Sequence, residues 1–136
     1  MKGKSAEEKH KSVKIIKSKK ELNAVFNFGK IIYSTDKIFK AYVLIIEDSI
    51  ESRIYTAAVV NRKCGNGVWR NRLKRLIRES FRQTKNILVD KLDRKNLLIK
   101  IVISPYLVNQ ESNKKIGLKQ TLPSISGILS AASRLI

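Results

Sequence analysis

The segment from Asn61 to Ser80, NRKCGNGVWRNRLKRLIRES, constrains the fold more than any other part of the chain. After the glycines at positions 65 and 67, apolar residues recur at helical spacing and predict one helix over about residues 68–89. At about 100° per residue, the apolar and basic side chains fall on different arcs of this helix. The apolar arc contains Trp69, Leu73, Leu76 and Ile77, and the basic arc contains Arg70, Asn71, Lys74, Arg75, Arg78 and Arg82. One face can therefore serve a core while the other carries concentrated positive charge.

The basic face differs from an ordinary solvated helix surface. Arg70, Lys74 and Arg78 form a ladder of like charges at i, i+4 and i+8, a spacing that destabilises an isolated helix. The ladder begins in the N-terminal half, where the helix macrodipole disfavours cations. A bound polyphosphate would relieve both effects, and the excess of Arg over Lys favours bidentate phosphate recognition. We therefore expect this face to bind nucleic acid.

The overall charge favours the same class of partner. The 136 residues include 29 Lys and Arg against 11 Asp and Glu, a formal net charge of +18, and a polyanion would offset the resulting self-repulsion. An anionic membrane is a weaker alternative, because the best amphipathic helix needs its apolar face for the core. Cys64 is the only cysteine, and no run approaches the roughly 20 apolar residues of a membrane span. We expect a cytoplasmic protein without a membrane partner.

The length and the 43% hydrophobic content predict one compact domain of mixed α/β (α+β) class. Residues 1–17 are Lys-rich and are expected to form a flexible basic tail, followed by a single RNA-binding domain over 18–136. Ser18 and Glu21 predict a capped short helix that stops near Gly29. Apolar runs predict four strands, near 30–34 and at 38–47, 53–61 and 96–104. We expect the strands at 38–47 and 53–61 to form a hairpin. The strand at 96–104 is almost continuously apolar and should be buried on both faces. A terminal helix is predicted over about 122–136.

Protein-based catalysis finds no support in the sequence. His10, the only histidine, lies in the expected tail, and Cys64 has no Cys or His near it, so neither a zinc site nor a Cys–His nucleophile is predicted. Three carboxylates cluster in the turn before residue 53, but acidic turns are commonly only solvated. Glu79 should pair with Arg75 or Arg82. No catalytic residue and no metal ligand are therefore assigned to the protein.

The Arg-rich segment resembles the signature of the bacterial ribonuclease P protein component. That signature is a basic pair, Gly, a small residue, Val, Arg-Asn-Arg, an apolar residue, Lys-Arg, two further residues and Arg-Glu. The resemblance extends over roughly Ser18 to Ser104 and is carried most strongly by the positions that match the signature. These are Arg62, Lys63, Gly65, Val68, Arg70, Asn71, Arg72, Lys74, Arg75, Arg78 and Glu79.

The resemblance implies a fold and a function. The fold would have about four strands and a left-handed βαβ crossover through the Arg-rich helix. The protein would be a subunit of an RNA-based endoribonuclease, binding the catalytic RNA and precursor tRNA and assisting removal of the 5′ leader, with no DNA partner. Catalysis would belong to Mg²⁺ bound mainly by the RNA. The face towards the catalytic RNA would contain Arg62, Lys63, Arg70, Asn71, Arg72, Lys74, Arg75 and Arg78.

The resemblance also implies a leader-binding cleft between the first helix and the open face of the sheet. Phe26, with Gly29 and Lys30 after it, matches the family's V-F-x-x-G pattern, although Phe26 could equally be a core residue. Period-2 alternation places Ala57, Val59 and Asn61 on one strand face. The sequence departs from the family at Val59 and Asn61, where small hydroxyl residues are usual, at Gly67, often Ala, and at Leu22, often aromatic.

Two other functions remain open from the residues alone. A structural RNA-binding protein, such as a small ribosomal protein, could carry a similar tail and Arg-rich helix. A transcription factor could insert this helix into a major groove, but it would prefer a specific duplex site and usually be a symmetric dimer. Stimulation of precursor-tRNA processing separates the first alternative from the lead interpretation.

Overall fold

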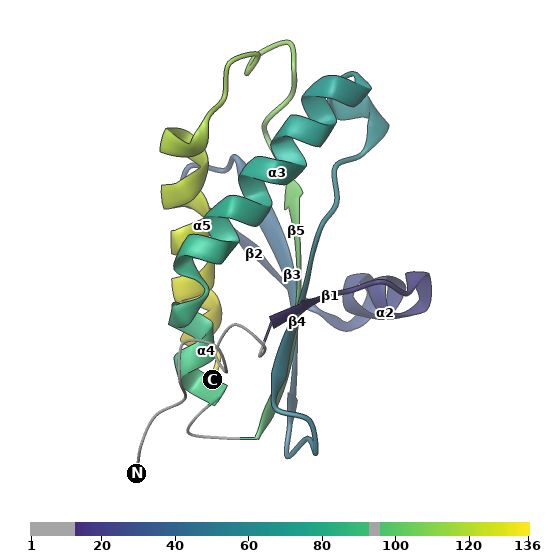
Figure 1. Cartoon of the computed structure of the whole chain (residues 1–136), viewed down its shortest axis with the longest axis vertical. Helices are drawn as coiled ribbons and strands as arrows, with labels where there is room; N and C mark the ends of the chain where they lie inside the picture. The colour runs from purple at the N-terminus through teal and green to yellow at the C-terminus, as the bar shows by residue number, and fades with distance from the viewer. Residues whose placement is uncertain (1–12, 93–95) are drawn as a thin grey trace.

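A five-stranded sheet forms the centre of the molecule (Figure 1) in this computed structural model, which describes residues 13–92 and 96–136. The strand order is β1-β4-β5-β3-β2, with β5 antiparallel to β3 and parallel to β4. The central strand is buried on both faces only from Ile101 to Pro105; Leu98 and Lys100, which face α2, are half-buried, so its continuous apolar run predicted the burial in part. The strands are β1 (Val13–Ile15), β2 (Lys30–Tyr33), β3 (Phe39–Glu47), β4 (Arg53–Ala58) and β5 (Leu97–Pro105).

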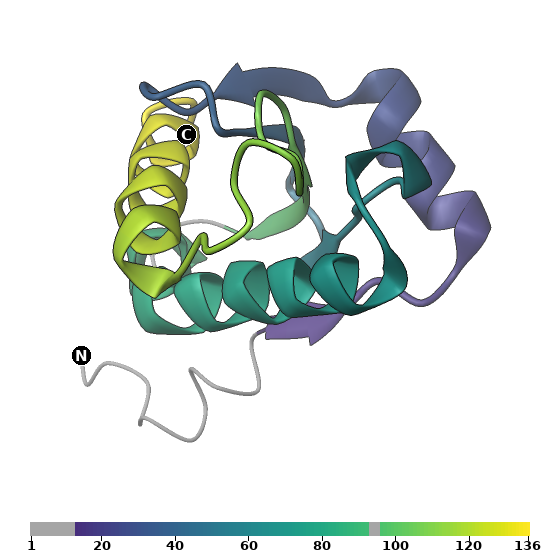
Figure 2. The same cartoon turned by 90° about the horizontal axis from the view of Figure 1, so that it is seen from above.

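Four α-helices cover the sheet unequally. α3, α4 and α5 pack on one face, over the larger core, and α2 packs alone on the other face (Figures 1 and 2). The face under α2 has only a small cluster around Val25 and Val102, which leaves much of it open. The helices are α2 (Lys19–Phe28), α3 (Gly67–Thr84), α4 (Asn86–Leu92) and α5 (Leu118–Ser133), and a 3₁₀ turn, η1 (Arg62–Cys64), precedes α3.

The hairpin predicted between the strands at 38–47 and 53–61, which are β3 and β4, is wrong. β3 pairs with β2 and β5, and β4 pairs with β1 and β5, so β5 separates the two strands that follow each other in sequence. The most continuously apolar strand takes the centre, where the larger core covers one face fully and α2 covers the other face around Val102. β3 forms its hairpin with β2 instead, in a register that places Tyr33 opposite Lys40.

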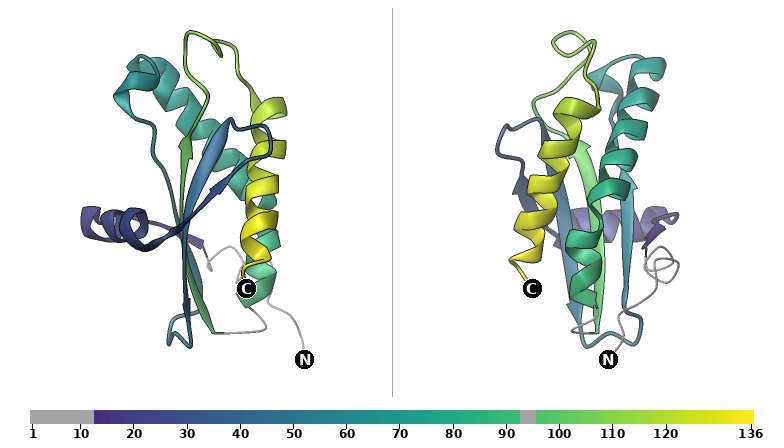
Figure 3. Two further views of the ribbon diagram at one scale, coloured as in Figure 1. Left: turned by 180° about the vertical axis from the view of Figure 1, so that it is seen from behind. Right: turned by 60° about the vertical axis from the view of Figure 1, so that its left-hand side comes forward.

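The connection from β4 to β5 runs through η1, α3 and α4 and joins two parallel strands. In the right-hand view of Figure 3, α3 lies in front of the sheet, both strands point upward, and the chain steps leftward from β4 to β5. Such a path is left-handed, whereas nearly all βαβ connections are right-handed. The crossover expected from the family resemblance is therefore confirmed.

The helix boundaries differ from the predicted ones. The long helix expected over 68–89 divides at Lys85, and Thr84 Oγ1 donates to the Ser80 carbonyl at 2.7 Å just before the division. Hydroxyl bonding of this kind often bends helices. The break lets α4 direct Leu88 and Val89 into the core. The last helix begins at Leu118 instead of 122, because the Gln120 side chain accepts the Gly117 N–H at 3.0 Å and caps an earlier turn.

The flexible tail predicted over residues 1–17 is contradicted at residues 13–16. Val13 to Ile15 form β1, parallel to β4, and the Ile16 N–H donates to the Thr56 carbonyl at 2.9 Å. Ile16 is buried against Val25 and Val102. The exposed edge of β4 offers hydrogen bonds to this segment, and apolar burial outweighs the surrounding lysines. Residues 1–12 of the predicted tail lie outside the described part of the chain.

Candidate nucleic-acid interface

The start of α3 is fixed by the loop that precedes it and by the loop between β5 and α5. The Asn66 side-chain oxygen accepts the Trp69 N–H at 2.9 Å and caps the helix. Gln110 accepts the Asn66 N–H at 2.8 Å and donates its own N–H to the Cys64 carbonyl at 2.7 Å. A Cβ at Gly65 would lie 2.7 Å from the Gln110 Cβ, so only glycine fits there without movement. No local sequence pattern points to Gln110, because its contacts with Cys64 and Asn66 join residues more than 40 positions apart.

The apolar arc of α3 packs as predicted, with one addition. Trp69, Leu73 and Ile77 are buried in the core, and Leu76 is partly buried beside them. Phe81, which lies at the border of the two arcs, is also buried. The opposite side of the helix is therefore left to the polar and basic residues.

Two of the arginines assigned to RNA binding also contact this chain. Arg70 Nε donates to the Gly65 carbonyl at 3.1 Å, and Arg72 Nη1 lies 3.5 Å from the Lys114 carbonyl oxygen, so both are partly used to hold adjacent loops. Within residues 13–92 and 96–136, no hydrogen bond or ion pair from protein engages the side chains of four other predicted residues. They are Asn71, Lys74, Arg75 and Arg78.

Glu79 neutralises the end of the basic face by pairing with Arg82, one of its two expected partners. Arg82 donates two hydrogen bonds to the Glu79 carboxylate, at 2.9 and 2.5 Å, and Gln83 donates a third at 2.9 Å. The hydrogen bonds from Arg82, and then from Gln83, lower the pKa of Glu79 to about 2. Arg75 is left exposed and available for a ligand.

The basic pair before the helix is well placed for the same ligand. Arg62 and Lys63 are exposed in η1, at the N-terminal end of α3.

Cys64, beside the basic pair, is half-buried, and its thiol donates to Asn61 Oδ1 at 3.3 Å. Burial raises the pKa of Cys64, against smaller opposite effects from the Asn61 backbone and Arg70. The thiol is therefore neutral at physiological pH and is not an activated nucleophile.

The loop between β5 and α5 adds basic groups that the sequence analysis missed. Asn113 accepts the Trp69 indole N–H at 3.2 Å through its carbonyl, which holds the loop against the first turns of α3. Lys114 and Lys115 are exposed on this loop, and the Lys114 backbone lies beside Arg72. No local sequence signal connects them to the helix, because the contact joins residues more than 40 positions apart.

A second candidate surface lies between α2 and the sheet. Phe26 on α2 is half-buried and meets the Tyr42 ring edge-on, with 4.8 Å between centroids. Ala57 and Val59 pack in the same cluster, as the alternation predicted. Asn61 is exposed beyond the end of β4, next to η1.

Lys30 is not brought to this surface, although the family resemblance assigned it to the leader-binding cleft. Lys30 lies opposite Val43 in the β2–β3 register, and directly opposed residues share a face of the sheet. Val43 is buried in the core under α3 and α5, so Lys30 leaves the sheet on that side, away from Phe26. The sequence placed it near Phe26 only because the two residues are four positions apart.

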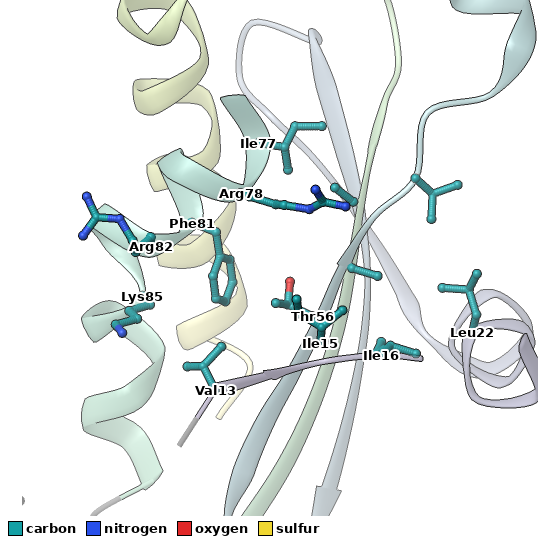
Figure 4. Close-up of a pocket in the computed structure, with 13 residues that line it drawn as sticks. Val13, Ile15, Ile16, Leu22, Thr56, Ile77, Arg78, Phe81, Arg82 and Lys85 are labelled. Carbon is teal, nitrogen blue, oxygen red and sulfur yellow. The ribbon is translucent and has the colours of Figure 1, made fainter. Parts of the chain in front are cut away.

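An apolar pocket of about 420 Å³ connects the two surfaces at the β1–β4 edge of the sheet (Figure 4). Figure 4 shows Arg78 extending from α3 into this space, with Leu22 of α2 on the far side. Ala57 and Val59 also line it. The basic face of α3 and the α2 face are therefore neighbours, so one ligand could contact both.

The described residues show no other kind of site. No group of three His, Cys, Asp or Glu side chains within them is arranged to hold a metal ion. Nor does any helix in this part of the chain have the length and apolarity to cross a membrane. Glu51, from the predicted acidic turn, instead accepts the Tyr55 hydroxyl at 2.7 Å and lies 3.5 Å from Arg53.

Comparison with known proteins finds a matching family and several similar folds. The family model for ribonuclease P matches residues 11–118. The RNase P protein of Thermotoga maritima is 23% identical, with a TM-score of 0.65 over 85% of this chain and 94% of that one. A Staphylococcus aureus RNase P protein mutant with defective mRNA degradation activity is also 23% identical, with a TM-score of 0.64 over 87% and 86% of the two chains. No curated protein matches the sequence.

Proposed function

Because this chain belongs to the ribonuclease P protein family, we propose that it is the protein subunit of a ribonucleoprotein that removes the 5′ leader from precursor tRNA. The protein binds the catalytic RNA and the leader, and the chemistry takes place on the RNA. The observation that carries this proposal is the basic face of α3, where Asn71, Lys74, Arg75 and Arg78 project without protein partners among the described residues.

The catalytic RNA is assigned to α3, η1 and the adjoining loop. Helical spacing presents Arg75 and Arg78 on one surface, and Arg62 and Lys63 add charge at the N-terminal end. Arg guanidinium groups suit phosphate oxygens because they offer planar, paired donors. Fixing the start of α3 through Gln110 and Asn113 holds this charge in one arrangement before RNA binds.

The leader is assigned to the α2 face of the sheet. The half-buried rings of Phe26 and Tyr42 can stack on bases, and stacking tolerates any base because every base has a flat face. We assign Mg²⁺ to the RNA, where it would supply an activated water and stabilise the leaving oxygen. The chain's own residues bind and orient the two RNAs, and cytoplasmic location follows from this partnership.

Reconstitution with the catalytic RNA of the same organism tests the proposal. At near-physiological Mg²⁺, the full chain should stimulate removal of the leader from precursor tRNA. Absence of stimulation would overturn the proposal and favour a structural RNA-binding protein. Selective binding to one duplex DNA site would instead favour a transcription factor.

Salt dependence tests which residues contact the catalytic RNA. If about six phosphates are neutralised, affinity should fall on the order of 10³-fold between about 50 and 200 mM salt. Arg75→Ala or Arg78→Ala should each lower the salt slope by about one, because each removes one phosphate contact. Arg134→Ala, an exposed arginine at the end of α5, is the matched control and should leave the slope unchanged. Unchanged slopes in both α3 variants would remove these residues from the interface.

A further inference from the structure

Two exposed tyrosines lie together at the β2 side of the sheet. Tyr33 ends β2 and Tyr106 follows β5, and their ring centroids are 4.8 Å apart with the rings tilted by 57°. Tyr33 is 43% exposed and Tyr106 is 44% exposed. Large apolar surfaces of this kind usually find a partner when they gather in one place.

Two lysines lie against these rings. Lys37 Nζ is 5.4 Å from the Tyr33 centroid. Lys40 Nζ is 5.7 Å from the Tyr106 centroid and 5.5 Å from the Tyr42 centroid. Amines and rings therefore alternate, and we call Tyr33, Lys37, Lys40 and Tyr106 the tyrosine–lysine track.

The track continues from the surface that Phe26 and Tyr42 form beside α2. In the strand register, Tyr33 lies opposite Lys40, and Lys40 shares its face of the sheet with Tyr42 two residues later. Tyr42 lies opposite Val102, which packs under α2, so all of these side chains leave the sheet on the α2 face. The edge-on contact between Tyr42 and Phe26 joins the track to α2.

The turn that carries Lys37 has an unfavourable backbone for a lysine. Lys37 has a φ of 63°, in the left-handed region that favours glycine. Asp36 fixes the turn by accepting the Ser34 hydroxyl at 2.6 Å and the Ile38 N–H at 3.1 Å. A glycine would satisfy this backbone better, so the turn itself does not require a lysine at this position.

We propose that the tyrosine–lysine track binds nucleotides of single-stranded RNA that extend beyond the Phe26–Tyr42 ring pair. The rings would stack on bases without selecting among them, and the amines would neutralise the phosphates between those bases. Cation–π contacts hold each amine beside a ring before RNA arrives. The inference rests on the proposed function, since the single-stranded ligand is the upstream part of the precursor leader.

The test uses the full chain and single-stranded RNAs of about 4 and about 12 nucleotides, the range of site sizes for such surfaces. The wild type should bind the longer RNA more tightly. The double variant Tyr33→Ala/Tyr106→Ala should lose about 5- to 150-fold in affinity per stacking ring for the longer RNA, and little for the shorter one. No loss, or an equal loss for both lengths, would overturn the proposal.

Three controls separate RNA binding from folding. Tyr33→Phe/Tyr106→Phe keeps both rings and should bind both RNAs like the wild type. Ile50→Ala removes a fully exposed apolar side chain from the turn at the other end of β3 and should change neither affinity. If the alanine variant fails to fold, Lys40→Gln decides the question, because it removes only an amine and should weaken binding of the longer RNA.

Lys37→Gly gives the sharpest result because its two effects have opposite signs. The melting temperature should stay the same or rise, since glycine suits the backbone at this position. Affinity for the longer RNA should fall, because the amine beside Tyr33 is lost. Unchanged affinity in this variant would also overturn the proposal. Leader removal with the catalytic RNA is measured separately, so a failure of the proposed function is distinguishable from a failure of the track.

Discussion

At the scale of single residues, the two surfaces differ in how their side chains are held. Arg75 and Arg78 are exposed and available, whereas Phe26 is half-buried and packed against Tyr42. Phe26 therefore packs as a core residue in part, and its exposed part stays available for the stacking role that we propose. Its ring belongs to the small cluster around Val25, and part of it still faces solvent on the α2 face.

Replacing Phe26 separates these roles. Phe26→Ala should leave assembly with the catalytic RNA intact and weaken the preference for precursor over mature tRNA by about 1–3 kcal/mol, the value of one stacked base. Binding of both tRNAs to the reconstituted enzyme measures this, with a melting curve alongside. Loss of the folded state would mean that the packing role dominates, and an unchanged preference would remove Phe26 from the leader site.

At the scale of elements, the start of α3 depends on close packing with the loop before α5. Gly65 lies against Gln110 and Trp69, so a Cβ there would come within 3 Å of both side chains. Gly67, two residues later, begins the helix in open space, where the nearest atom to a Cβ is Arg70 Nη2 at 3.9 Å. Close packing therefore requires a glycine at position 65, whereas the space around position 67 would accept a larger residue.

A pair of matched variants tests this difference. Gly65→Ala should destabilise the protein by about 1–3 kcal/mol through overpacking, and it should weaken catalytic-RNA binding by displacing η1 and α3. Gly67→Ala should stabilise the helix by up to about 1 kcal/mol and leave RNA binding intact. Urea denaturation and RNA titration measure the two effects. Equal behaviour of the two variants would contradict the close packing at Gly65.

At the scale of the whole molecule, one polar network joins the β2–β3 turn to the last helix. Ser124 of α5 hydrogen-bonds to the Asp36 carboxylate, which also accepts the Ser34 hydroxyl. Burial raises the pKa of Asp36, but the hydrogen bonds from Ser124, Ser34 and the Ile38 amide together lower it by a larger amount. The pKa of Asp36 therefore lies below its ordinary value. The contact spans 88 positions of sequence.

The network makes stability depend on acid. Because the folded pKa of Asp36 lies below the unfolded value of about 3.9, its contribution is complete above that value and is lost as the pH falls through the folded pKa. Asp36→Asn should therefore be less stable than the wild type at pH about 7, by no more than about 1 kcal/mol because Asp36 is exposed and solvent screens its interactions, and the difference should shrink in acid. Urea denaturation of both proteins, at pH about 7 and below about pH 3.9, measures this difference in the free energy of unfolding. A difference that persists in acid would show that charge is not its source.

The sequence by itself determined the basic face of α3, the capped start of α2 at Ser18 and the buried central strand, because each depends on local periodicity or on a local cap. It could not determine that β5 separates β3 from β4, or that Val13 to Ile15 join the sheet, because strand pairing is decided between distant residues competing for the same edges. The same reason explains the candidate site. Helical spacing identified Arg75 and Arg78, whereas the loop contact of Gln110, the exclusion of Lys30 and the meeting of Tyr33 with Tyr106 follow only from strand register and packing.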